Sequence, residues 1–189
     1  HPSAQQLRGG HRRFLTETLE DFRQHGADLP ADRKARLEAL QSELAQLTQK
    51  YAENVLDATN AWELLVTDAV RLRGLPPHAV EAARRSALAK GHGTEAQPVW
   101  RFTLHMPSQE PVMLYADDES LRRELWTAAA AVGAQSPHAN QELVRRILAL
   151  REEKAALLGR AHFADLVLSR RMAKDGDTAR RFIEDLQQK

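Results

Sequence analysis

Between residues 37 and 51, large apolar side chains recur at alternating steps of three and four, and this spacing constrains the fold more than any other feature. The residues are Leu37, Leu40, Leu44, Leu47 and Tyr51. Such steps place side chains in one stripe along an α-helix, the arrangement typical of a seam between two paired helices. A long helix is therefore expected. Its stripe could be an external docking surface, but burial in a core is the usual use of such a stripe.

The expected partner of this stripe is a preceding helix over residues 5–24. Leu15, Leu19 and Phe22 recur there at helical spacing, and a glycine near its end is a suitable C-terminal cap. The connection between the two helices is short, which favours an antiparallel arrangement. Residues 1–60 are therefore predicted to form a helical hairpin.

Residues 61–116 change pattern. The run 62–67 is rich in strand-forming residues, and over 99–105 large apolar residues alternate with polar ones at a period of two. A further strand is expected at 112–115, joined to the preceding one by a proline-bounded turn as a hairpin. An alanine-rich helix is expected at 78–90. This region is predicted to be a two- to three-stranded sheet with one inserted helix.

The helical pattern returns over residues 117–189. Asp117, Asn140 and Asp177 are the expected N-caps of three helices, and a shorter helix is expected around Phe163. The last helix is interrupted at the chain end, so this subdomain is expected to be truncated there. The predicted fold class is mainly α with a small antiparallel β-sheet (α+β), and the three regions together are expected to form one non-catalytic segment.

Charge and composition exclude several classes of partner. The chain has 189 residues with 27 Lys plus Arg against 26 Asp plus Glu, and the basic residues are scattered rather than gathered in a block. No nucleic-acid or anionic-membrane partner is therefore expected. The apolar stretches fall far short of the roughly 20 residues that span a bilayer.

Cysteine is absent, which suits a reducing compartment, and a cytoplasmic location is expected. The sequence starts at His1 without an initiator methionine or a signal-like segment, and helical patterning follows at once. We therefore interpret the chain as a piece of a larger protein.

No self-contained active site can be assembled from the sequence. A catalytic zinc on a helix usually requires His-Glu-x-x-His, in which two histidines four apart face one ion and the glutamate polarises water. None of the eight histidines is followed by Glu, and no two are three or four apart, so each is expected to be a surface or loop residue. They are His1, His11, His25, His78, His92, His105, His138 and His162.

Other candidate motifs also favour structural roles. The adjacent carboxylates Glu152 and Glu153, like Asp117 and Asp118, point in different directions on a helix and cannot share one bond. Ser108 has no G-x-S-x-G context, and the glycine pairs have no phosphate-loop framework. The three tryptophans could stack on bases in principle, but without a basic groove we assign them to the core: Trp62, Trp100 and Trp126.

An ordered succession of short motifs, from about Phe14 to Leu186, resembles a known family. The matching pieces are Asn54-Val55-Leu56-Asp57-Ala58-Thr59, Trp62, Thr67-Asp68, Gly74-Leu75-Pro76, Phe102-Thr103-Leu104, Pro107-Ser108, Pro111-Val112-Met113, Tyr115-Ala116, Leu121-Arg122, Glu124, Ile147-Leu148-Ala149-Leu150-Arg151, Ala155, Leu157-Leu158-Gly159 and Met172-Ala173. The chain resembles the zinc oligopeptidases of the thimet oligopeptidase and neurolysin family (peptidase family M3). It is more similar to the bacterial oligopeptidase A branch than to the dipeptidyl carboxypeptidases.

The resemblance implies a part of a neurolysin-like fold, in which two largely helical halves flank a deep channel. It also implies a parent enzyme that hydrolyses short peptides with a zinc-activated water. This chain resembles the portion before the zinc-binding catalytic region, so that region is an expected partner and the chain an expected part of the channel wall. No residue here matches the family's zinc ligands or catalytic glutamate. We therefore assign no catalytic or metal-binding residue, and the peptide-binding residues are unknown.

Two departures from the family pattern bear on substrate preference. Gln109 stands where relatives commonly carry an aromatic residue after the Pro-Ser pair, and the loop before Asn140 is shorter. The alternative hypothesis is a stand-alone helical scaffold or interaction module that shares ancestry with the peptidases. A His-Glu-x-x-His helix encoded after Lys189 in the parent gene would favour the peptidase reading.

Overall fold

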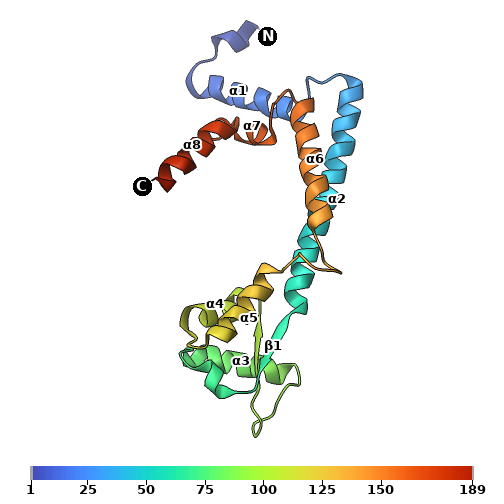
Figure 1. Ribbon diagram of the computed structural model, residues 1–189. Helices are drawn as coiled ribbons and strands as arrows, with labels where there is room; N and C mark the ends of the chain where they lie inside the picture. The colour runs from blue at the N-terminus through green and yellow to red at the C-terminus, as the bar shows by residue number, and fades with distance from the viewer. Residues whose placement is uncertain (1, 189) are drawn as a thin grey trace. The chain divides into compact units, whose positions relative to one another are not determined.

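The computed structural model describes residues 2–188, so His1 and Lys189 lie outside the described part (Figure 1). Twelve helical and extended elements follow one another along the chain. They are the 3-10 helix η1 (Pro2–Gln6), α1 (Gly9–Gln24), α2 (Ala31–Ala61), β1 (Glu63–Val66), the 3-10 helix η2 (Ala69–Leu72), α3 (Pro77–Ala89), β2 (Trp100–Thr103), α4 (Met106–Tyr115), α5 (Glu119–Ala130), α6 (Gln141–Leu157), α7 (Phe163–Leu168) and α8 (Gly176–Gln187).

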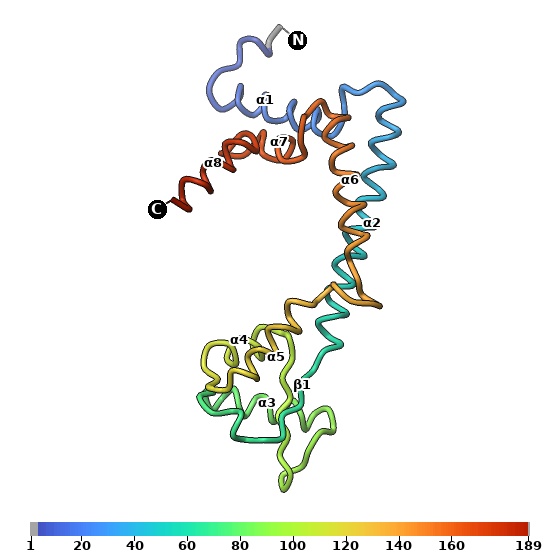
Figure 2. Tube along the Cα trace, viewed as in Figure 1, coloured from blue at the N-terminus to red at the C-terminus, as the bar shows by residue number. Residues whose placement is uncertain are grey.

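The predicted fold class is confirmed, because helices dominate and β1 and β2 form a two-stranded antiparallel sheet. Among the described helices, none has both the length and the apolar character needed to cross a membrane. The chain forms two compact units: the first contains the residues up to Thr48 and those from Val144 onward, and the second runs from Gln49 to Leu143 (Figure 2). The sequence-based division at residues 60 and 116 concerns the order of elements and stays a prediction.

In the first unit, two ion pairs link α2 to α6. Arg36 Nε donates to Glu153 Oε1 at 2.5 Å, and seven residues further along α2, Glu43 Oε1 accepts from Arg146 Nε at 2.5 Å. Because the partner number falls by seven as the α2 number rises by seven, the helices run antiparallel (Figure 1). Both ion pairs are well exposed and contribute only about 0–1 kcal/mol each. The buried apolar side chains of the two helices contribute more: Leu37 and Leu40 of α2, and Ile147 and Leu150 of α6.

The predicted pairing of α1 with the α2 stripe was wrong. None of the α1 residues is buried, and Phe22, one of the three expected seam residues, is 59% exposed. α1 is instead tied to the segment after α7, where Arg170 Nη1 donates to Asp21 Oδ1 at 2.7 Å. Helical spacing identified the apolar face of each helix, but it carries no information about which other helix covers that face.

Burial along the stripe is uneven, and this changes the expected cost of truncation. Leu40 is fully buried, whereas Leu44 is only half-buried. Leu40→Ala should lower the free energy of unfolding by about 2–5 kcal/mol, as at tightly packed sites. Leu44→Ala should cost less, because part of that side chain already contacts water. Urea unfolding followed by circular dichroism would compare them, and equal costs would contradict the packing described.

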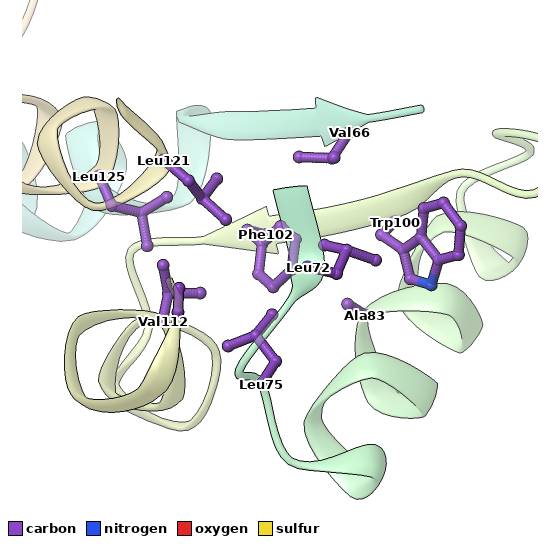
Figure 3. Close-up of a cluster of buried hydrophobic side chains, with 10 residues drawn as sticks. Val66, Leu72, Leu75, Ala83, Trp100, Phe102, Val112, Leu121 and Leu125 are labelled. Atoms are coloured by element: carbon purple, nitrogen blue, oxygen red, sulfur yellow. The ribbon is translucent and has the colours of Figure 1, made fainter. Parts of the chain in front are cut away.

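The second unit is built around the sheet. β1 and β2 pair in register, with Leu64 opposite Phe102 and Val66 opposite Trp100. The strand predicted at 99–105 is therefore confirmed in its centre, and its buried face carries Trp100 and Phe102. The strand predicted at 62–67 is also confirmed, and it is the partner of β2. Figure 3 shows these side chains meeting those of α5 and of the segment before α3.

The predicted strand at 112–115, and with it the 99–105/112–115 hairpin, was wrong. Residues Met106–Tyr115 form α4, with Pro107 at its start and Pro111 inside it. Proline is tolerated in the first turn, where the missing N–H has no helical partner. A four-residue apolar run does not distinguish strand from helix, and here the buried residues Val112 and Ala116 are four apart, which is helical spacing.

Two N-caps lie close to the predicted residues but differ from them. Asp118, not Asp117, caps α5, and Asp175, not Asp177, caps α8. Trp126 also departs from its assignment to the core, because it lies on α5 and is 62% exposed. The helical patterns were correct, but neighbouring aspartates offer equivalent cap signals, and a single tryptophan does not reveal which face of its helix it occupies.

Candidate functional site

The second unit contains an apolar groove of about 920 Å³. Trp62 and Leu64 line it from the start of the sheet, and Leu104 lines it from just after β2. Thr127, Ala128 and Ala131 line it from α5 and its end, and residues 132–138 close it. A concave, mostly apolar surface with a few polar groups is typical of a peptide or small-molecule site.

The α5 wall is fixed at its first turn by Asp118. This carboxylate accepts hydrogen bonds from the backbone N–H of Ser120 at 2.8 Å and of Leu121 at 3.2 Å. Arg71 Nε donates to Asp118 Oδ2 at 2.8 Å, and Arg71 Nη2 donates to Glu124 Oε1 at 2.7 Å. η2 and α5 are therefore linked through one guanidinium.

These contacts hold the pKa of Asp118 well below its ordinary value, chiefly through the hydrogen bond with Ser120 and then that with Arg71. Because the folded-state pKa is the lower one, the cap stabilises the fold above the ordinary aspartate pKa. That contribution is lost as the pH falls from there through the depressed value. The α5 wall is thus firm at neutral pH.

The loop wall is fixed by a buried pair of amides. Asn54 Nδ2, on α2, donates to Asn140 Oδ1 at 2.9 Å, and Asn140 Nδ2 donates to the carbonyl of Tyr51 at 3.3 Å. The backbone N–H of Asn140 donates to the carbonyl of Gly133 at 2.7 Å. Asn140 was expected to cap the following helix, and it directly precedes α6. Its side chain also holds the loop 132–138 against α2.

The histidines of the described chain are dispersed. His92 Nε2 lies 3.5 Å from Glu63 Oε1, and His105 Nε2 is paired with Asn60 Oδ1 at 3.0 Å. His25 lies beside Asp21, and His138 lines the groove. His11, His78 and His162 are exposed, and His1 lies outside the described residues.

The side chains of the described residues do not fit a zinc ion. Within residues 2–188, no three His, Asp or Glu side chains come together as a ligand set. A catalytic zinc needs about three protein ligands and an open position for water. That any zinc ligands lie outside this sequence stays a prediction.

Comparison with known proteins adds the evidence that geometry alone does not supply. The family model described as peptidase family M3 matches residues 112–189. Oligopeptidase A of Escherichia coli (strain K12) is 36% identical over 185 residues, which cover 95% of this chain and 26% of that protein. Part of this chain therefore matches peptidase family M3. Other similar proteins include oligopeptidase A of Salmonella typhimurium, 35% identical over 95% of this chain and 26% of that protein. Dipeptidyl carboxypeptidase of Escherichia coli (strain K12) is 28% identical over a stretch that covers 85% of this chain and 23% of that protein.

The chain spans about a quarter of the length of the curated relatives it matches. The family resemblance drawn from ordered short motifs is confirmed. The groove was not foreseen, because its walls come from α2, β1, α5 and the loop 132–138, which are far apart in sequence. The one local signal was the unusual loop before Asn140, which forms one wall.

Proposed function

We propose that this chain is a non-catalytic part of a zinc oligopeptidase of family M3, and that its groove forms part of the wall along which short peptides bind. The observation that carries the proposal is an alignment over 95% of this chain that covers only 26% of the oligopeptidase A of Escherichia coli. The apolar groove between α5 and the sheet supports the role in the channel wall. The zinc ligands and the catalytic glutamate are then supplied by the rest of the parent protein.

Activity should therefore depend on the polypeptide beyond this sequence. The parent protein should cleave a quenched fluorescent peptide of about ten residues and lose that activity with a chelator, because a zinc-bound water is the attacking group. Residues 1–189 alone should leave the peptide intact and retain no stoichiometric zinc after dialysis. Cleavage by residues 1–189, or a parent that is inactive with zinc present, would overturn the proposal.

A second variant tests the groove itself in the parent protein. Thr127 lies exposed on α5 and lines the groove, so Thr127→Trp fills part of it without disturbing the core. KM for short peptides should rise several-fold with a smaller change in kcat, the expected result when uniform binding is lost. Ala130→Trp, exposed at the end of the same helix and outside the groove lining, is the matched control. Equal effects of both variants would exclude the groove as a peptide site.

One specific observation bears on the scaffold alternative. α8 has a strongly one-sided apolar face on which Phe182, Ile183 and Leu186 are exposed. Under the peptidase proposal, the remainder of the parent covers this face; under the alternative, another protein does. A parent gene without a His-Glu-x-x-His helix would favour the alternative.

A cytoplasmic location is part of the proposal. It is supported by the absence of cysteine and by a relative named probable cytosolic oligopeptidase A, whereas another relative is named organellar.

A further inference from the structure

A second hollow, of about 440 Å³, lies in the second unit between α3, β2 and the start of α4. Its floor is formed by small side chains of α3, including Ala79, Ala82 and Ala83, beside the ring of Phe102. Because these alanines are short, the space above them is left open. The hollow is distinct from the groove described above, with which it shares no lining residue.

Arg101 supplies the main charge of this hollow. Its side chain is only 13% exposed, and its Nε donates to Glu63 Oε2 at 2.5 Å while Nη1 donates to Ser86 Oγ at 2.9 Å. The pKa of Glu63 is lowered, mainly by this hydrogen bond with Arg101. The guanidinium is thus held in one orientation. Among the described residues, its Nη2 has no hydrogen-bond partner, so this nitrogen keeps both N–H groups available.

Lys90 and Ser108 add further donors, while Asn60 Oδ1, which also lines the hollow, is an acceptor paired with His105 Nε2. Lys90 Nζ makes no ion pair within the described chain, and its positive charge adds to that of Arg101. Ser108 Oγ accepts the backbone N–H of Thr103 at 2.9 Å, which leaves its own O–H free to donate. No Asp or Glu is among the lining residues. The hollow therefore presents two cations and several donors above an apolar floor.

We propose that this hollow binds a carboxylate of a peptide, with Arg101 Nη2, Lys90 Nζ and Ser108 Oγ as donors. Guanidinium groups fixed by other contacts are well suited to carboxylates, because their planar N–H groups match the two oxygens. The apolar floor receives the aliphatic part of the residue that carries the carboxylate. That the ligand is a peptide rests on the proposed function. The carboxylate belongs either to a chain terminus or to an Asp or Glu side chain.

The test is a titration of residues 1–189 with short peptides, followed by NMR of the backbone amides of Thr103 and Ser108. Three peptides distinguish the sources: an alanine pentapeptide with a free C-terminus, its C-terminal amide, and an amidated version with one central Glu. N-terminal acetylation of all three removes the other charge. Saturable shifts at Thr103 and Ser108 with the first or third peptide, and none with the second, are the expected result. No shift with either acid peptide, or equal shifts with all three, would overturn the proposal.

Variants identify the donors. Arg101→Gln should weaken binding about 10- to 100-fold, because a hydrogen bond to a charged group is lost. Lys90→Gln, at an exposed position where folding is not at risk, should weaken it about threefold and flatten its dependence on salt. Arg85→Gln, on the exposed side of the same helix and paired with Glu81, is the control and should bind as the original chain does. Unchanged binding in Lys90→Gln would contradict the assignment. These experiments measure binding to this chain, not cleavage. A failure to bind would therefore leave the proposal of peptide cleavage by the parent standing, and a parent that cleaves no peptide would leave the binding result standing.

Discussion

Phe102→Ala should lower the free energy of unfolding of the second unit by about 3–5 kcal/mol, the range for truncating a large aromatic residue in a core. Phe102 is 2% exposed and lies at the centre of the buried cluster formed by the sheet, η2, α4 and α5 (Figure 3). The cluster is built from side chains of all these elements, so the cavity left by removing the ring should not be filled by a shift of one helix. Of the substitutions considered for this chain, it should be among the most damaging.

Tryptophan fluorescence is a suitable measure of this effect, because of where the tryptophans lie. All three tryptophans, Trp62, Trp100 and Trp126, lie in the second unit, so fluorescence in urea reports on that unit alone. Phe14→Ala is the control: Phe14 is largely exposed on α1, and the change should stay within about 0.5 kcal/mol. A fluorescence midpoint for Phe102→Ala equal to that of the original chain would show that the cluster does not stabilise the unit.

Gly74→Ala should cost about 2–5 kcal/mol, from two causes that add. Gly74 has φ = +86°, and an L-residue in this left-handed region costs about 1–2 kcal/mol. A Cβ there would also lie 2.1 Å from the backbone oxygen of Tyr115 and 2.8 Å from Asp117 Oδ1. Since Asp117 N–H donates to the carbonyl of Arg73 at 2.8 Å, this backbone is tied in place. Relieving the contact should cost a further 1–3 kcal/mol, roughly as for other overpacked sites.

Gly91→Ala separates the two causes. Gly91 also has a positive φ of +79°, but a Cβ there would meet nothing within 4 Å. Its cost should therefore be the conformational part alone, about 1–2 kcal/mol. Urea midpoints of the two variants, read from tryptophan fluorescence, give the comparison. If Gly74→Ala cost no more than Gly91→Ala, the close approach of residues 115–117 to Gly74 would not be a real constraint.

Local patterns in the sequence predicted the elements well. The alternation of Trp100 and Phe102 with polar neighbours identified β2, and the alanine-rich run after the double proline identified α3, because side-chain period depends only on backbone geometry. The error at residues 112–115 came from a run too short to show a period. Val112 and Ala116 reveal helical spacing only when the residue after the run is included.

Long-range partners could not be predicted from these patterns. α2 was expected to pack on the helix next to it in sequence, whereas it is linked by ion pairs to α6, about a hundred residues later. The same limit applies to both hollows. Arg101, Ser86 and Ser108 meet only because α3, β2 and α4 converge, and no spacing in the sequence brings their side chains together. The ordered family motifs, by contrast, carried information from the whole chain, and they identified the family correctly.

The amide pair Asn54 and Asn140 has a consequence for evolution rather than for stability. Asn54 Oδ1 is buried without a hydrogen-bond partner among the described groups, so the pair is not the most stable filling for this position. An apolar pair would pack there without that cost, but it would tolerate a slip of one helical turn between α2 and the segment entering α6, whereas two matched amides do not. Replacing Asn140 would leave Asn54 Nδ2 without its partner in the interior, and replacing Asn54 would leave Asn140 Oδ1 without its donor. The two residues should therefore change together or not at all when related sequences diverge.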